Sequence, residues 1–242
     1  MPLIRNLSNA LSHEVRTLRG VLYKRLAGRG GINPDVAAEF HRMYFDARDF
    51  NLTWRNTFYL GHPILKCPLD LWLYQEIIHR IRPGLIVETG TAFGGSALYL
   101  ANLCDTIGHG RVMTVDLNPK PDLPAHPRLE YVVGSSTAPE IFARVKAAAA
   151  QAGPVIVFLD SDHAMAHVER EMELYHTLVT PGSYMVVEDT NLNGHPVMPE
   201  HGPGPWEAVE RFTQRHQEFA HDTAMDKFLV SFNPRGYLKR LS

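Results

Sequence analysis

The sequence predicts an α/β fold with a doubly wound, mostly parallel sheet and an N-terminal helical extension. Short apolar segments alternate along the chain with longer segments whose apolar residues recur at helical spacing. This alternation is typical of parallel strands joined by helices. A glycine-rich turn follows one apolar segment and acidic residues follow several others, at the positions where such sheets bind ligands.

The boundaries of the elements follow from the same pattern. Asn33 is suited to cap a helix, and Pro34 to its first turn, which needs no amide donor. The expected helices cover residues 34–50, 68–81, 138–150, 164–179 and 206–216, with another beginning at Ser96. The expected strands cover residues 85–87, 111–116, 129–133, 154–160 and 183–187, followed by a closing pair at 219–221 and 228–232.

Composition narrows the class of protein. The chain has 242 residues, of which 45% are hydrophobic, and a formal charge of −2. It is therefore long enough for one large domain with a full core, and its charge does not indicate nucleic-acid binding. Cys67 and Cys104 lack metal-site spacing and are expected to be reduced. No apolar run reaches the roughly 18 residues of a membrane span and no signal-peptide core is present, so the cytoplasm is expected.

The first 31 residues differ from the rest of the chain. They include six basic residues but a single acid, Glu14, and leucines recur at helical spacing between Leu3 and Leu26. Packing against the domain or a sister subunit, peripheral contact of residues 1–30 with an anionic membrane, and an organelle-targeting peptide all remain open. We expect residues 1–50 to form a helical extension, residues 51–242 to form the main domain, and the apolar face to favour a homo-oligomer.

A glycine-rich turn after the 85–87 strand is the centre of the predicted site. Its residues are Glu88, Thr89, Gly90, Thr91, Gly94, Gly95 and Ser96. The glycines fit neither the dinucleotide fingerprint nor a P-loop, although the start of a helix can still bind an anionic group. Glu88 would repel a pyrophosphate and pair with an ammonium group, which favours S-adenosylmethionine. An ordinary tight turn is the structural alternative.

Polar residues follow the next two strands. Asp116 ends the 111–116 strand, where a carboxylate can accept hydrogen bonds from ribose hydroxyls. This placement fits adenosine and does not by itself distinguish S-adenosylmethionine from NAD. Ser135 and Ser136 follow the 129–133 strand, where an adenine ring can lie, while Ser136 is equally suited to cap the following helix.

Three acids end two further strands. Asp160 ends the 154–160 strand, and Glu188 and Asp189 lie at the end of the 183–187 strand. The carboxyl ends of neighbouring parallel strands lie about 5 Å apart, so these carboxylates can converge. A hard divalent cation such as Mg²⁺, Mn²⁺ or Ca²⁺ would relieve their repulsion, although a single acid at such a position is commonly a helix cap or turn former.

His163 lies three residues after Asp160, at the start of the next helix. Its imidazole titrates near neutral pH and is a candidate general base, and a solvated histidine is the alternative. His163 and His167 together with Asp160 also match a two-histidine, one-carboxylate iron site, but the three carboxylates are the better-placed ligand set.

The combination of these motifs resembles the cephalosporin hydroxylase and rhamnosyl O-methyltransferase family. The matching stretches are residues 66–70 (Lys-Cys-Pro-Leu-Asp), 88–96, 158–163 (Phe-Leu-Asp-Ser-Asp-His) and 187–190 (Val-Glu-Asp-Thr). The resemblance implies a Rossmann-like class I methyltransferase fold, S-adenosylmethionine at the glycine turn and Asp116, and Mg²⁺ on Asp160, Glu188 and Asp189. A more distant likeness to catechol-type O-methyltransferases places Lys at the position of His163.

The resulting hypothesis is a Mg²⁺-dependent S-adenosylmethionine O-methyltransferase. It would act on a hydroxyl of a small molecule or sugar in natural-product, including antibiotic, or glycan biosynthesis, with Asp160 and His163 as catalytic residues. The alternatives are an NAD- or iron-dependent oxidoreductase or hydroxylase of secondary metabolism, and a cofactor-binding scaffold without turnover. The identity of the acceptor is not determined by the sequence.

Overall fold

The computed structural model describes residues 33–242. The chain divides into two compact units between Phe40 and His41. In the part of the first unit that is described, the side chain of Asn33 accepts a hydrogen bond from the amide of Asp35 (2.9 Å), as expected for a helix cap. The predictions for residues 1–31, including peripheral membrane contact and association, lie outside the described residues, and the division at residue 50 stays a prediction.

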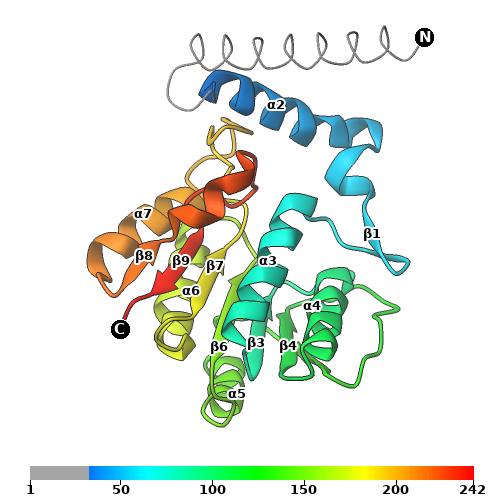
Figure 1. Cartoon of the computed structure of the whole chain (residues 1–242), viewed down its shortest axis with the longest axis vertical. Coiled ribbons are helices and arrows are strands. Elements are labelled where there is room, and N and C mark those ends of the chain that lie inside the picture. The colour runs from blue at the N-terminus through cyan, green and yellow to red at the C-terminus, as the bar shows by residue number, and fades with distance from the viewer. Residues whose placement is uncertain (1–32) are drawn as a thin grey trace, which may run out of the picture. The chain divides into compact units, whose positions relative to one another are not determined.

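The main unit is built on a seven-stranded sheet (Figure 1) with the order β5-β4-β3-β6-β7-β9-β8. The strands are β3 (Leu85–Thr89), β4 (Arg111–Asp116), β5 (Leu129–Val133), β6 (Val155–Leu159), β7 (Tyr184–Val187), β8 (Phe219–His221) and β9 (Tyr237–Arg240). The first five are parallel, and β9 runs antiparallel to both β7 and β8. The chain winds outward in both directions from β3 and β6, so the prediction of a doubly wound, mostly parallel sheet is confirmed.

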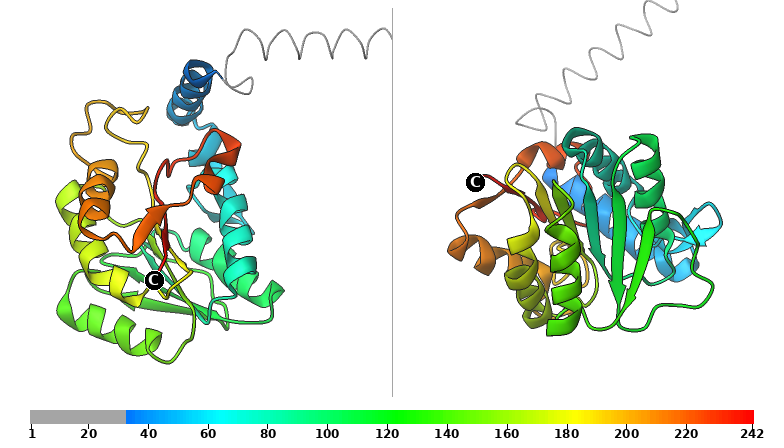
Figure 2. Two further views of the ribbon diagram at one scale, coloured as in Figure 1. Left: turned by 60° about the vertical axis from the view of Figure 1, so that its left-hand side comes forward. Right: turned by 90° about the horizontal axis from the view of Figure 1, so that it is seen from below.

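Helices cover both faces of this sheet (Figure 2). One face packs against α3 (Pro68–Ile81) and α4 (Gly95–Thr106) through a cluster that includes Ile77, Leu100 and Ile156. The other face packs against α5 (Pro139–Ala149), α6 (Met165–Tyr175) and α7 (Pro205–Arg215). Both cysteines are buried and free, as the sequence predicts. No helix within residues 33–242 combines the length and apolar character that a membrane span needs.

Short elements complete the main unit. A two-stranded sheet precedes α3 and consists of β1 (Phe58–Tyr59) and β2 (His62–Pro63). Between the longer elements lie the 3-10 helices η2 (Ala47–Phe50), η3 (Thr53–Asn56), η4 (His176–Leu178) and η5 (Thr223–Phe228). Helix α2 (Pro34–Asp46) and helix α6 are each shorter than predicted, because their last turns tighten into η2 and η4.

The predicted strand at 228–232 is wrong, and β9 occupies its place beside β8. The carboxylate of Asp70 in α3 accepts hydrogen bonds from the Ser231 hydroxyl (2.6 Å) and the Phe232 amide (2.8 Å). The Phe232 ring packs edge-on against Phe45 and Trp54. These contacts hold the segment outside the sheet, and the chain reaches the sheet only at Tyr237.

Gly90 lies where the β3 end meets the β6 end. Its φ is +90°, and a Cβ there would come within 1.9 Å of the backbone oxygen of Asp160. Gly182 also has a positive φ, +82°, but its missing Cβ would meet nothing within 4 Å. Gly90 is therefore required both by its backbone conformation and by the lack of room for a Cβ, whereas Gly182 is required by its backbone conformation alone.

We predict that Gly90→Ala lowers the free energy of unfolding by about 3 kcal/mol or more, because strain adds to overlap with a rigid backbone. Gly182→Ala is the matched control and should cost only about 1–2 kcal/mol, the penalty of left-handed backbone. Urea denaturation monitored by circular dichroism measures the free energy of unfolding of both variants. Equal losses in the two variants would contradict the role of the close approach at Gly90.

Candidate active site

The carboxyl ends of β3, β4, β5 and β6 surround a pocket of about 210 Å³. It is lined by Gly90, Val115, Asp116, Leu117, Ser135, Ser136, Ser161, Asp162 and His167. The pocket lies at the point where the strand order reverses, between β3 and β6. This is the usual ligand position in an open α/β sheet. Four residues predicted to bind a cofactor, Gly90, Asp116, Ser135 and Ser136, are therefore brought together by the fold.

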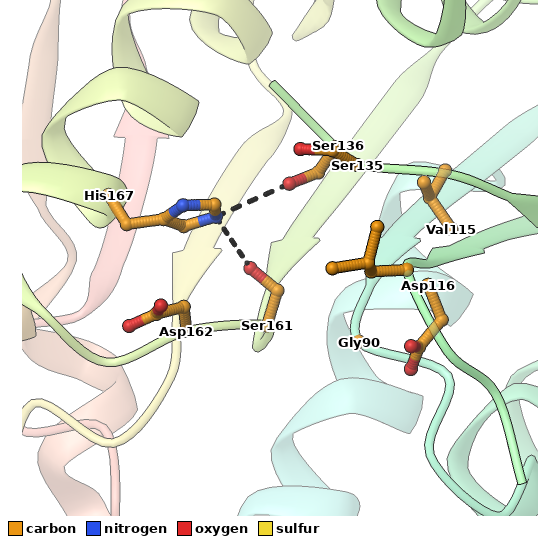
Figure 3. Close-up of a pocket in the computed structure, with 9 residues that line it drawn as sticks. Gly90, Val115, Asp116, Ser135, Ser136, Ser161, Asp162 and His167 are labelled. Atoms are coloured by element: carbon orange, nitrogen blue, oxygen red, sulfur yellow. Dashed lines mark hydrogen bonds between the residues drawn. The ribbon is translucent and has the colours of Figure 1, made fainter. Parts of the chain in front are cut away.

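Asp116 is held by the backbone around it. Its Oδ2 accepts a hydrogen bond from the amide of Ala92 (2.9 Å), and its Oδ1 accepts one from the amide of Asn118 (2.7 Å). Figure 3 shows its carboxylate beside Gly90. A carboxylate has about four acceptor positions, so Asp116 can still accept bonds from two neighbouring hydroxyls.

His167 closes the opposite end of the pocket. Its Nε2 lies 3.1 Å from the Ser161 hydroxyl and 3.4 Å from the Ser136 hydroxyl (Figure 3). Ser161 donates in turn to buried Glu171 (2.8 Å), which raises the pKa of His167 through its hydrogen bond and its charge. This arrangement directs His167 to the pocket wall, away from the iron site considered for His163, His167 and Asp160.

Glu88 lies inside the sheet. Only 1% of its surface is exposed, and its Oε2 accepts a hydrogen bond from the Thr114 hydroxyl (2.7 Å). Burial raises its pKa, while Lys66 and hydrogen bonds from Ser96 and Thr114 oppose that rise. Glu88 is not part of the pocket lining, so its pairing with a ligand ammonium group stays a prediction.

The remaining residues of the turn shape the backbone around this acid. The Thr91 hydroxyl lies 2.7 Å from that of Thr114, and the Thr89 hydroxyl accepts from the amide of Asp160 (3.3 Å). Gly94 adopts a φ of +74° and forms the N-cap of α4. A Cβ at Gly95 would come within 2.2 Å of the Pro63 oxygen, so this glycine lets the segment before Lys66 approach α4.

Lys66 is the residue that sequence reasoning missed. Its side chain is 6% exposed, and its Nζ donates hydrogen bonds to Asp160 Oδ2 and to Glu188 Oε2 (2.6 Å). Burial alone would lower the pKa of Lys66, but the attraction of Asp160 and Glu188 outweighs burial and raises it. Lys66 is therefore a fixed cation between two of the predicted metal ligands. Its only signal in the sequence is its place in the Lys-Cys-Pro-Leu-Asp stretch, where it directly precedes a helix.

Asp160, which contacts Lys66, also forms a cluster with His163 and Asp189. Each offers a ligand atom within 4.8 Å of the other two. His163 Nδ1 lies 3.1 Å from Asp189 Oδ2, and its Nε2 lies 3.6 Å from Asp160 Oδ1. Burial raises the pKa of Asp189 to about 6, and the neighbouring His163 opposes that rise.

Glu188 contacts Lys66 and is not one of the three residues of that cluster. Its side chain is 5% exposed, and burial raises its pKa while Lys66 lowers it. Its Oε2 binds Lys66, which leaves its other oxygen as the atom that a cation can use. The predicted set of Asp160, Glu188 and Asp189 thus lies at one edge of the sheet, with Lys66 occupying part of it.

The backbone of Asp189 is constrained from the C-terminal segment. Its φ is +53°, which is uncommon for a residue with a side chain, and its amide donates to Asn233 Oδ1 (3.0 Å). Asn233 donates to the Tyr74 hydroxyl (2.8 Å). The unusual backbone conformation at this acid is therefore stabilised by a segment that lies more than 40 positions along the chain.

The aromatic residues Trp54 and Tyr59 lie outside the pocket lining. The Trp54 indole donates to the Phe45 carbonyl (3.1 Å), and Tyr59 packs edge-on against Tyr99 on α4. The long loop at 191–205 is anchored at one end, because Asn193 and His195 both contact the carboxylate of Glu207.

Removing the charge of Lys66 should strongly destabilise the fold, because it leaves buried carboxylates without a partner. We predict that Lys66→Met lowers the free energy of unfolding by about 3–5 kcal/mol. Lys227→Met is the matched control: it breaks an exposed pair with Glu76 and should cost no more than about 1 kcal/mol. Chemical denaturation measures both variants, and a loss below about 1 kcal/mol in Lys66→Met would contradict the assignment.

Comparison with known proteins places these features in a wider context. The model of a family described as "Rhamnosyl O-methyltransferase/CmcI" matches residues 51–241. The rhamnosyl O-methyltransferase of Mycobacterium tuberculosis (strain ATCC 25618 / H37Rv) is 41% identical over 212 residues, which cover 85% of each chain. That of Mycobacterium leprae (strain TN) is 40% identical over 211 residues, covering 85% of this chain and 90% of the relative.

Two solved structures share the fold. The structure "CmcI-N160 apo-structure" has a TM-score of 0.63 at 22% sequence identity and covers 78% of this chain and 77% of its own. The structure "cmcI-D160 Mg-SAM" has a TM-score of 0.60 at 20% identity and covers 78% of each chain. Both support the class I methyltransferase fold that the sequence motifs imply.

Proposed function

The chain belongs to the rhamnosyl O-methyltransferase/CmcI family, and from this premise we propose that it transfers the methyl group of S-adenosylmethionine to a sugar hydroxyl, assisted by a divalent cation. One observation carries the proposal. The Asp160, His163 and Asp189 cluster and the pocket beside Asp116 lie at the same edge of the sheet. The proposed cation ligands and the proposed nucleoside pocket are therefore neighbours, as methyl transfer to an activated hydroxyl requires.

The donor side fits S-adenosylmethionine. Asp116 offers acceptor positions to ribose hydroxyls, and Ser135, Ser136 and His167 offer polar contacts to a base. The start of α4 provides amide groups for a carboxylate beside the glycine turn. Glu88, Thr89, Thr91, Gly94 and Ser96 are the further proposed contacts, acting through the turn that they form.

The ligand set fits a hard cation such as Mg²⁺. Asp160, Glu188 and Asp189 carry three carboxylates, and Lys66 neutralises only one unit of their charge. Their oxygens are the ligand type that Mg²⁺ prefers, and Asp160 Oδ1 is not used by Lys66. A cation bound there would act as a Lewis acid and lower the pKa of the acceptor hydroxyl.

The chain's own residues supply the remaining steps. His163 is placed to take the hydroxyl proton, and the carboxylates of Asp160 and Asp189 on either side stabilise the imidazolium that forms. Lys66 keeps its proton and holds Asp160 and Glu188 in position. The acceptor oxygen then attacks the sulfonium methyl in line, forming the O–C bond as the C–S bond breaks. Positioning of the two reactants contributes much of the rate.

The acceptor class follows from the relatives. Those at 40–41% identity are named rhamnosyl O-methyltransferases, so we propose a deoxysugar hydroxyl as the acceptor. Natural-product or glycan biosynthesis is the proposed setting. A homo-oligomer in the cytoplasm stays a prediction from the sequence.

Asp160→Asn should abolish methyl transfer to a rhamnoside acceptor while leaving S-adenosylmethionine binding intact, because it removes a proposed cation ligand and leaves the lining of the donor pocket unchanged. Asp116→Ala is the reciprocal variant and should lose cofactor affinity but keep Mg²⁺ affinity. Calorimetric titration of each ligand and a methyl-transfer assay give these four results. Asp105→Asn, on the exposed end of α4, is the control with unchanged activity. Full activity of Asp160→Asn, or of wild type in excess chelator, would exclude the role of the cation.

His163→Gln tests the general base separately from the cation. We predict a loss of about 10²–10⁴-fold in the rate of methyl transfer, with Mg²⁺ and S-adenosylmethionine affinities retained. The rate of the variant should recover as the pH is raised, since hydroxide then takes the proton. A parallel loss of Mg²⁺ affinity would instead identify His163 as a ligand.

A further inference from the structure

A second cluster of ligating side chains lies at the other end of α6, independent of the proposed active site. Glu173 lies in the last turn of α6, His176 begins η4, and His216 caps the C-terminus of α7. Each offers a ligand atom within 4.8 Å of the other two. Helix α6 has 11 residues, so about 16 Å of helix separates this cluster from the end that follows His163.

We propose that Glu173, His176 and His216 bind a borderline divalent cation such as Zn²⁺, which ties α6 to α7. Two imidazoles and one carboxylate form a ligand set that Zn²⁺ favours, with water in the fourth position. His216 Nε2 lies 3.2 Å from Glu173 Oε2. That spacing matches the edge of a tetrahedron around zinc, about 3.3 Å for ligand distances of 2.0–2.1 Å.

The outer contacts of both histidines are already in place. His176 Nδ1 lies 3.0 Å from the Met172 carbonyl, and His216 Nδ1 lies 3.0 Å from Glu218 Oε1. Histidines that bind metals commonly donate their second ring N–H to a carbonyl or a carboxylate, which fixes the tautomer. Both contacts engage Nδ1, so Nε2 is the remaining nitrogen of each ring, and that of His216 faces Glu173 Oε2. An incidental meeting of surface histidines would not require this shared arrangement.

The surroundings also suit a partly enclosed cation. The His216 ring stacks on Phe212 with centroids 4.2 Å apart, and His176 packs edge-on against the same ring. The side chain of His216 is 18% exposed and that of Glu173 is 37% exposed, so an ion can reach the cluster from solvent. An apolar wall on one side and water on the other are typical of a zinc site with an open position.

His216 Nε2 and Glu173 Oε2 form a hydrogen bond with each other, in which a cation would replace the proton, and the other charged groups contact different atoms. Arg215 contacts Glu173 through Oε1 (2.8 Å), which is not the oxygen that faces His216. Arg240 donates to the backbone carbonyl of His176 (3.5 Å) and to that of Val179 (2.7 Å). Glu218 adds negative charge beside His216. The two arginines are therefore engaged by other oxygens, and the carboxylates favour a cation.

The test is calorimetric titration of Zn²⁺ into the chelator-stripped full chain and its variants. We expect His176→Gln and His216→Gln each to bind one equivalent fewer than wild type, or to bind that equivalent more than 100-fold more weakly. His221→Gln is the matched control, because His221 pairs with a single carboxylate, Asp226 (2.9 Å), and should leave the stoichiometry unchanged. Unchanged stoichiometry and affinity in both His176→Gln and His216→Gln would overturn the proposal.

Two further measurements keep the proposal falsifiable if a histidine variant folds poorly. Glu218→Gln should keep the zinc equivalent but weaken its affinity about 10–100-fold, the usual effect of losing an outer contact. Co²⁺ should give the visible absorption of a tetrahedral site in wild type and in Asp160→Asn, and lose it in Glu173→Gln. Zinc should also raise the unfolding temperature of wild type, because it binds only the native arrangement of α6 and α7. A Co²⁺ spectrum that survives Glu173→Gln would contradict the assignment.

Discussion

The buried contact of Lys66 with Asp160 and Glu188 is the constraint on which the rest of the site depends. The fold places three acids at the ends of β6 and β7, where their mutual repulsion would oppose folding. Lys66 offsets part of this repulsion without occupying every oxygen. The negative charge that remains is the basis of the proposed cation site, so one interaction bears on both stability and the proposed chemistry.

The C-terminal segment explains why these acids remain in place. Asp70 is 1% exposed and accepts hydrogen bonds from Ser231, Phe232 and the Tyr237 hydroxyl (2.7 Å). That contact positions Asn233, which in turn accepts from the amide of Asp189. Asp70 lies in the first turn of α3 and Lys66 lies just before its N-cap, so the start of this helix contacts both the acids and the C-terminal segment. The start of α3 and the C-terminal segment thus both position residues of the candidate site.

The parallel strands could be predicted from the sequence because each is a buried apolar segment with clear ends. Strands β4 and β5 begin and end at the predicted residues, and Asp116, Asp160 and Glu188 lie at strand ends as expected. The predicted strand at 228–232 was wrong because the Ser231 hydroxyl and the Phe232 amide both bond to Asp70, some 160 residues away. The role of Lys66 was hidden for a similar reason, since a lysine before a helix is usually solvated. Residues whose partners are distant in sequence are thus beyond local patterns.

The central claim is that acids at the ends of β6 and β7 hold a divalent cation beside the donor pocket. The most direct measurement is a crystal structure of the protein grown with Mg²⁺ and S-adenosylhomocysteine. The account predicts a cation about 2.0–2.1 Å from oxygens of Asp160 and Asp189, with the ribose of the nucleoside on Asp116. A fully bound nucleoside with no cation at these carboxylates, or with the cation elsewhere, would contradict it.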